Sequence, residues 1–92
     1  MACYIISYDQ HRDKDYTPIW TALRSWGAQR VLESLWLLEN AAGPGEIREA
    51  LRTQTKDEDS LVIIELNQGA TWSAYKAQPA GVNWLGENIR QY

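Results

Sequence analysis

Residues 3–9, Cys-Tyr-Ile-Ile-Ser-Tyr-Asp, constrain the fold more than any other stretch of this chain. The run is rich in β-branched and aromatic side chains and ends on a carboxylate, which predicts a short strand. Side chains alternate between the two faces of a strand. One face carries Ile5, Ser7 and Asp9, and the other carries Tyr4, Ile6 and Tyr8. Large apolar groups therefore occur on both faces, so we expect helices to cover one and another segment to cover the other.

Two later stretches show the spacing of amphipathic helices. The first begins near Asp15 or Thr17, with Pro18 in its first turn, and ends at Gly27. Its apolar stripe consists of Tyr16, Ile19, Trp20, Leu23 and Trp26. The second helix opens at Pro44. Its apolar side consists of Ile47, Ala50 and Leu51.

The remaining elements are predicted to be strands and a short final helix. Residues 29–39 favour two strands joined at Glu33-Ser34. Residues 60–66 are almost continuously apolar, which predicts a central strand covered on both faces. In the tail, Asn83 is a candidate cap for a last helix, separated from the segment before it by residues 79–81.

The expected order is strand, helix, strand, strand, helix, strand, followed by an extension. This order predicts an α+β, ferredoxin-like βαββαβ fold with an antiparallel sheet and both helices on one face. We expect one domain over residues 1–92, with a core of 1–66 and a C-terminal extension of 67–92. The extension or a second copy of the chain would have to cover the other face of the sheet.

Composition narrows the classes of protein further. The net charge of −3 argues against a strong general attraction to nucleic acid, although a local basic patch remains compatible with it. Five Trp and five Tyr in 92 residues suggest that some aromatic surface is buried against a partner. The single cysteine, Cys3, is expected to be a small buried hydrophobe. We expect neither a membrane span nor a signal peptide, and hence a cytoplasmic location.

Three motifs together resemble a known family. The first strand closes on Tyr8-Asp9, the first helix ends at Ser25-Trp26-Gly27, and residues 30–36 read Arg-Val-Leu-Glu-Ser-Leu-Trp. This pattern is similar to that of the small CRISPR-associated endoribonucleases, ferredoxin-like dimers that partner the CRISPR integrase. The related virulence-associated toxin ribonucleases share the fold and the first-strand Asp. Trp36 stands where the family pattern has Phe.

The resemblance implies a homodimer in which the Asp9 side chains of two subunits face each other across a two-fold axis. Two such carboxylates can share a Mg²⁺ or Mn²⁺ ion, which can activate water for attack on a phosphodiester. Asp9 is therefore the candidate catalytic residue and metal ligand. Arg12, Lys14 and Arg30 are candidate nucleic-acid contacts. In the family the dimer also holds DNA against the integrase, a role in antiviral defence that needs no cutting.

Other interpretations of these residues stay open. Asp9 can be a capping carboxylate. His11 can be a solvated loop residue rather than a general acid or base. Arg12, Lys14 and Arg30 can be solvated side chains that contact no nucleic acid. Ser7 and Ser34 are candidate phosphate contacts or satisfied hydroxyls. The acidic residues 56–59 favour a solvated loop over a metal site. The alternative for the whole chain is a non-enzymatic dimeric module that binds a protein partner, or a component of a toxin–antitoxin pair.

Overall fold

The computed structural model describes residues 2–9, 17–54, 60–67 and 69–89, and these residues form seven helices and strands. The two predicted strands joined at Glu33-Ser34 are confirmed and form an antiparallel hairpin, and both predicted early helices are confirmed. The elements in chain order are β1 (Ala2–Asp9), α1 (Thr17–Ser25), β2 (Gln29–Leu32), β3 (Leu35–Asn40), α2 (Pro44–Arg52), β4 (Ser60–Leu66) and α3 (Pro79–Asn88).

The four strands form one antiparallel sheet in the order β2-β3-β1-β4. Ile5 of β1 lies between Leu37 of β3 and Ile64 of β4, which fixes the register of the three longer strands. The structure is thus a small α+β structure with an antiparallel sheet and three helices. It is compatible with the ferredoxin-like fold expected from the sequence.

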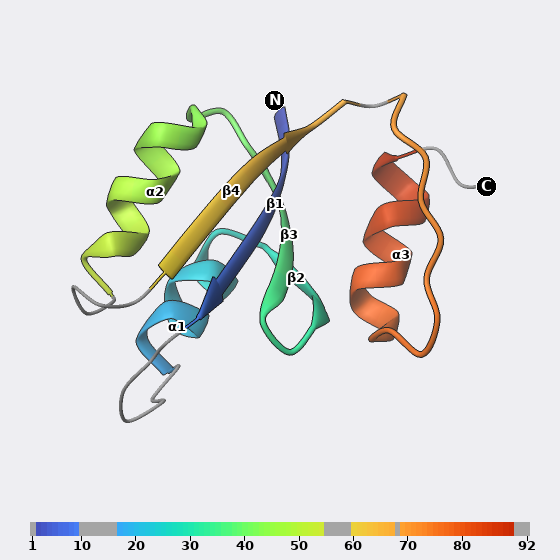
Figure 1. Ribbon diagram of the computed structural model, residues 1–92, viewed down its shortest axis with the longest axis horizontal. Helices are drawn as coiled ribbons and strands as arrows, with labels where there is room; N and C mark the ends of the chain where they lie inside the picture. The colour runs from blue at the N-terminus through green and yellow to red at the C-terminus, as the bar shows by residue number, and fades with distance from the viewer. Residues whose placement is uncertain (1, 10–16, 55–59, 68, 90–92) are drawn as a thin grey trace.

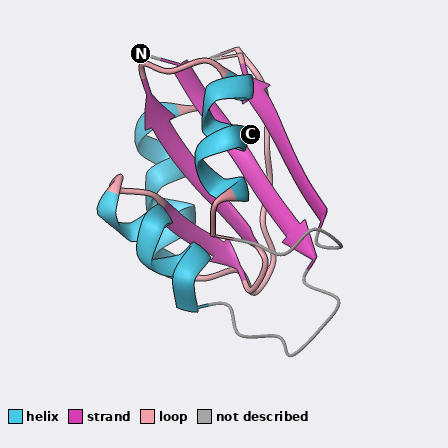
Figure 2. Cartoon of the chain, turned by 90° about the vertical axis from the view of Figure 1, so that its left-hand side faces the viewer, coloured by secondary structure: helices cyan, strands magenta, loops and turns pink. Residues whose placement is uncertain are grey.

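The helices lie in two layers, one on each side of the sheet (Figure 1). Helices α1 and α2 lie on one side, and Figure 2, turned so that this side faces the viewer, shows helices crossing in front of the strands. Their core contains Tyr4, Ile6, Tyr8, Ile19, Leu23, Trp36, Ile47 and Leu51. Helix α3 lies on the other side, over a second cluster that contains Cys3, Val31, Leu37, Leu85 and Ile89. On this side of β1, Cys3 is covered, whereas Ile5 and Ser7 are half-buried and Asp9 is exposed, so the expectation that both faces are covered holds only in part.

Local signals account for where the two early helices begin and end. Gly27 has a φ of 80°, the left-handed conformation that ends a helix at little cost for glycine. Pro44 opens α2, and the Glu46 carboxylate accepts a hydrogen bond of 3.1 Å from the Gly43 N–H. Both features involve residues close together in sequence, so the pattern alone was sufficient to place them.

Three sequence predictions about burial and boundaries are wrong. Strand β4 is an edge strand, not a central one, and Val62 and Ile64 are 53% and 51% exposed. A continuous apolar run indicates apolar surroundings, but it does not say whether the surface is covered within one chain. Ala50 is exposed because α2 buries only Ile47 and Leu51.

The third error concerns the last helix. It begins at Pro79, with Gln78 as the N-cap residue, so Asn83 lies inside the helix. Pro79 suits the first turn because its missing N–H would be unpaired there in any case.

Helix α3 approaches β2 unusually closely at Gly81. A Cβ atom at this position would lie 2.4 Å from the Cβ of Val31 and 2.6 Å from the carbonyl oxygen of Arg30. The Gln78 N–H also donates a 2.9 Å hydrogen bond to the Val31 carbonyl. The start of α3 is therefore fixed against the outer strand of the sheet. In the described part of the chain, no helix is long and apolar enough to cross a bilayer.

Candidate functional site

Asp9 ends β1 with its side chain exposed to solvent. It pairs with Ser60 at the start of β4, and strand alternation places it on the same face as Ile5 and Ser7. This is the face opposite α1 and α2, because Tyr4, Ile6 and Tyr8 pack toward those helices. The predicted metal ligand is thus accessible from outside.

Apolar side chains adjoin Asp9 on this face. Val62 lies opposite Ser7 in the sheet register, and Ile64 lies opposite Ile5. Helix α3 packs mainly against β2 and β3, so about half of the Val62 side chain and of the Ile64 side chain stays exposed. We call the surface formed by Ile5, Ser7, Asp9, Val62 and Ile64 the open face.

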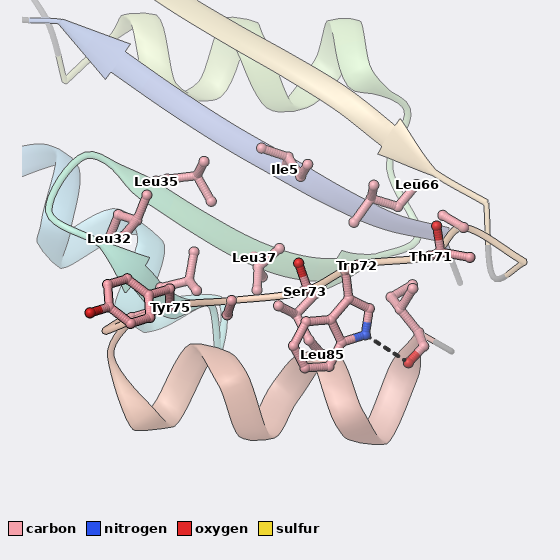
Figure 3. Close-up of a pocket in the computed structure, with 15 residues that line it drawn as sticks. Ile5, Leu32, Leu35, Leu37, Leu66, Thr71, Trp72, Ser73, Tyr75 and Leu85 are labelled. Atoms are coloured by element: carbon pink, nitrogen blue, oxygen red, sulfur yellow. Dashed lines mark hydrogen bonds between the residues drawn. The ribbon is translucent and has the colours of Figure 1, made fainter. Parts of the chain in front are cut away.

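An apolar hollow of about 330 Å³ borders the open face. Figure 3 shows Ile5, Leu35, Leu37 and Leu66 projecting from the sheet on one side, with Trp72, Tyr75 and Leu85 on the other. The indole N–H of Trp72 donates a 3.2 Å hydrogen bond to the Ile89 carbonyl, which ties the tail to the end of α3 (Figure 3). Tyr75 is 82% exposed, so this hollow has an uncovered aromatic side chain at its rim.

A polar network lies on the opposite side of the sheet, under α1. The Tyr8 hydroxyl accepts hydrogen bonds from the indole N–H groups of Trp20 and Trp36, the latter at 3.1 Å. The same hydroxyl donates to the Glu33 carbonyl at 3.2 Å. Because Trp36 is 1% exposed, its N–H has no access to water and depends on Tyr8. The network fixes the orientation of both indole rings.

Two arginines stack on these indoles. The Cζ of Arg30 lies 4.1 Å from the centroid of Trp20 and 4.7 Å from that of Trp36. The Cζ of Arg24 lies 5.8 Å and 5.6 Å from the same two rings. A cation at these distances is attracted by the negative face of the ring. The guanidinium groups of Arg24 and Arg30 therefore lie close together, beside Trp20 and Trp36.

The structure does not bring the predicted site residues together. Arg30 stacks on Trp36, which donates a hydrogen bond to Tyr8, on the side of the sheet that α1 and α2 cover. Asp9 lies on the open face, on the other side. Ser7 is half-buried on the open face, and Ser34 lies in the turn between β2 and β3. His11, Arg12 and Lys14 lie outside the described residues, as do residues 56–59.

Asp9 and Cys3 differ in whether their side chains can bind a metal ion. Within residues 2–9, 17–54, 60–67 and 69–89, no cluster of three or more His, Cys, Asp or Glu side chains could hold an ion. Burial raises the pKa of the Cys3 thiol above its ordinary value of 9.0, with Glu39 adding to the effect. The thiol is therefore protonated near neutral pH, as expected of a buried hydrophobe. Asp9 offers the oxygen ligand that Mg²⁺ and Mn²⁺ prefer. Each chain supplies only one Asp9 carboxylate, so a shared site needs two chains.

Sequence reasoning missed the role of Tyr8 and the contacts of Arg24 with the indoles. Arg24 lies off the apolar stripe of α1 and is exposed, yet its guanidinium stacks on Trp20 and Trp36. Residues 8, 20, 24, 30 and 36 come from four different elements, and only Trp20 and Arg24, four residues apart in α1, are linked by a local spacing. The abundance of Trp is the one signal that pointed toward such contacts.

No protein-family model matches this chain, and no solved structure matches it significantly.

Proposed function

We propose that this chain forms a homodimer through its open face and hydrolyses phosphodiester bonds of RNA or DNA at a divalent metal site shared by the two Asp9 side chains. One observation carries the proposal: the exposed Asp9 lies on the same face as the half-exposed Val62 and Ile64. A second copy placed on the apolar residues by a two-fold axis would remove them from water. The same axis, passing beside Asp9, would bring the two carboxylates together.

In this proposal the two Asp9 carboxylates hold Mg²⁺ or Mn²⁺ and orient the substrate phosphate near it. When bound, the ion supplies charge neutralisation on the phosphate and lowers the pKa of a bound water. Removing the open face from solvent lowers the local dielectric and strengthens the interaction between the carboxylates and a cation. The same proposal includes membership of the CRISPR-associated endoribonucleases, which the ferredoxin-like arrangement and the sequence resemblance support. It also includes a cytoplasmic role together with an integrase.

The dimer is tested before the chemistry. Ile64→Glu places a charge in the open face, while Ala50→Glu adds the same charge on the exposed side of α2. Light scattering at micromolar concentration should report a dimer for the wild type and Ala50→Glu and a monomer for Ile64→Glu. A monomeric wild type would remove the shared site altogether.

Cleavage is then measured with labelled single-stranded RNA and double-stranded DNA in Mg²⁺, Mn²⁺ or EDTA. Asp9→Asn keeps the size of the side chain and removes its charge, and Glu87→Gln is the matched control on the exposed side of α3. We expect metal-dependent cutting by the wild type and Glu87→Gln, and loss of at least about 100-fold in Asp9→Asn, since a catalytic metal supplies several kcal/mol. Equal cutting by the two variants would show that Asp9 has no catalytic role.

The apolar hollow favours a second candidate, a non-enzymatic dimeric module that binds a protein partner. Its rim exposes Tyr75 and Leu32, the latter 49% accessible, and aromatic side chains are enriched at protein interfaces. A scaffold for an integrase or a component of a toxin–antitoxin pair would use such a surface. A folded dimer that cuts neither RNA nor DNA in any of the metals would favour this candidate.

A further inference from the structure

We propose that a hollow at the outer edge of β2 binds the phosphate group of a small molecule, with Arg24 and Arg30 as its cationic ligands. This hollow has a volume of about 340 Å³ and is separate from the apolar one. Its lining comes from the end of α1 and the turn after it, from β2, from Trp36 of β3 and from the start of α3. The polar side chains in this lining are Arg24, Gln29, Arg30 and Gln78. The proposal does not rest on the proposed nuclease activity, because Asp9 takes no part in it.

The first argument is uncompensated charge. Both guanidinium groups lie within 6 Å of the same two indole rings, so two positive charges share one small region. In the described part of the chain, the ion pairs involve Arg48 and Arg52, and none involves Arg24 or Arg30. Like charges placed together disfavour the folded state unless an anion lies between them. The region therefore favours an anionic ligand.

The second argument is the hydrogen-bonding state of Arg30. Its Nε and Nη2 atoms are buried and have no hydrogen-bond partner in the described structure. Stacking on the Trp20 and Trp36 faces does not satisfy them, because guanidinium N–H groups point outward in the plane of the group. These two nitrogens form the edge of the guanidinium that binds phosphate or carboxylate oxygens in a bidentate manner. A buried unpaired donor is costly, so a ligand that supplies acceptor oxygens would be favoured.

The third argument concerns the start of α3, which forms part of the same lining. Gln78 and Ala80 border the hollow, and the Gln78 side chain does not cap the helix. The first-turn N–H groups of a helix carry partial positive charge and lack intrahelical partners. Together with the two arginines, they favour a compact multivalent anion over a neutral ligand. Phosphate has both the charge and the number of acceptor oxygens that this set of donors requires.

Tyr8 makes the arrangement rigid. By holding both indole N–H groups, it fixes the two ring faces on which Arg30 stacks. A stacked guanidinium held in place loses less conformational entropy when it binds a ligand. The indoles also report on the site, since an anion beside the arginines changes the magnetic environment of their N–H protons.

The test is a titration of the ¹⁵N-labelled protein at constant ionic strength, with inorganic phosphate and AMP as probes. The indole N–H resonances of Trp20 and Trp36 are followed, after assignment with single Trp→Phe variants. We expect saturable shifts at these two resonances for both probes. Tighter binding of AMP than of phosphate would assign the ligand to phosphate monoesters, and equal binding would assign it to free phosphate.

Matched variants decide whether the arginines are responsible. Arg24 is exposed, so Arg24→Gln is expected to fold, and Arg48→Gln removes the same charge from α2. We expect Arg24→Gln to weaken phosphate binding about tenfold or more, as for a charge-assisted hydrogen bond. Arg48→Gln should change it less than about twofold.

Two results would overturn the proposal. One is the absence of saturable shifts at Trp20 and Trp36 with both small probes, including the case in which only a single-stranded oligonucleotide binds. The other is an equal effect of Arg24→Gln and Arg48→Gln, which would mean that phosphate responds only to net charge.

Discussion

The hydroxyl of Tyr8 is the most informative single group to remove from this protein. Tyr8→Phe deletes the acceptor for two indole N–H groups and the donor to the Glu33 carbonyl, while keeping the buried ring. The N–H of Trp36 would be left unpaired in a site with no access to water. An unpaired buried donor costs about 1–3 kcal/mol.

Adding the partly accessible N–H of Trp20, we expect Tyr8→Phe to lower the free energy of unfolding by about 2–4 kcal/mol. This is a large part of the 5–15 kcal/mol or so that is typical of a small protein. Tyr4→Phe is the matched control, because the Tyr4 hydroxyl donates a 2.7 Å hydrogen bond to the Ala42 carbonyl and holds no indole in the described part of the chain. Its loss should cost about 1 kcal/mol.

Urea unfolding of the wild type, Tyr8→Phe and Tyr4→Phe, followed by Trp fluorescence and by circular dichroism, measures these differences. The slope of free energy against urea should be the same for all three, since the surface exposed on unfolding barely changes. If Tyr8→Phe were no less stable than Tyr4→Phe, the hydroxyl of Tyr8 could not be holding the two indoles.

Further predictions concern the packing of α3, the response to pH and a surface ion pair. Gly81→Ala should destabilise the protein by about 1–3 kcal/mol, because the added Cβ would overpack against β2. At Gly86 an added Cβ meets nothing within 4 Å, so Gly86→Ala should be neutral or stabilising by up to about 1 kcal/mol. Thermal unfolding of the two variants measures the difference. Burial raises the pKa of Cys3 above 9.0 and that of Tyr4 above 10.0, so the folded state holds these protons more tightly than the unfolded state. Their stabilisation is complete below about pH 9 and is lost as the pH rises through the folded pKa values, so urea midpoints should fall as the pH rises above about 9, and less steeply in Tyr4→Phe. Hydrogen bonds from Arg48 and Arg52 lower the pKa of Glu49, so its small contribution to stability is present above pH 4.5 and is lost in more acidic solution. Because the ion pairs are exposed, Glu49→Gln should leave the urea midpoint at pH 7 nearly unchanged, and a clear drop would contradict this.

Asp9 and the arginines show how far sequence reasoning reaches into the candidate sites. The alternation of residues 3–9 placed Asp9 at the end of a strand, on the same face as Ile5 and Ser7, and the structure agrees. Only the structure shows that α1 and α2 cover the other face, which carries Tyr4, Ile6 and Tyr8. Arg30 was a candidate nucleic-acid contact for the site at Asp9, but the stack on Trp36 places Arg30 on the other side of the sheet. Only contacts between distant residues decide which side chains meet.

The sequence by itself determined the features that depend on near neighbours along the chain. A glycine that tolerates a φ of 80° ends α1, a proline opens α2, and a polar pair separates β2 from β3. Each is set by backbone sterics or by hydrogen bonds within a few residues, so a window of ten residues contains the relevant physics. The tertiary structure alone decided that β4 lies at the edge, that α3 covers β2 and β3, and that Arg24 and Arg30 share two indoles. The reason is that apolar burial is non-directional: a hydrophobic side chain gains similar free energy against any apolar neighbour, so its sequence cannot specify which neighbour that is.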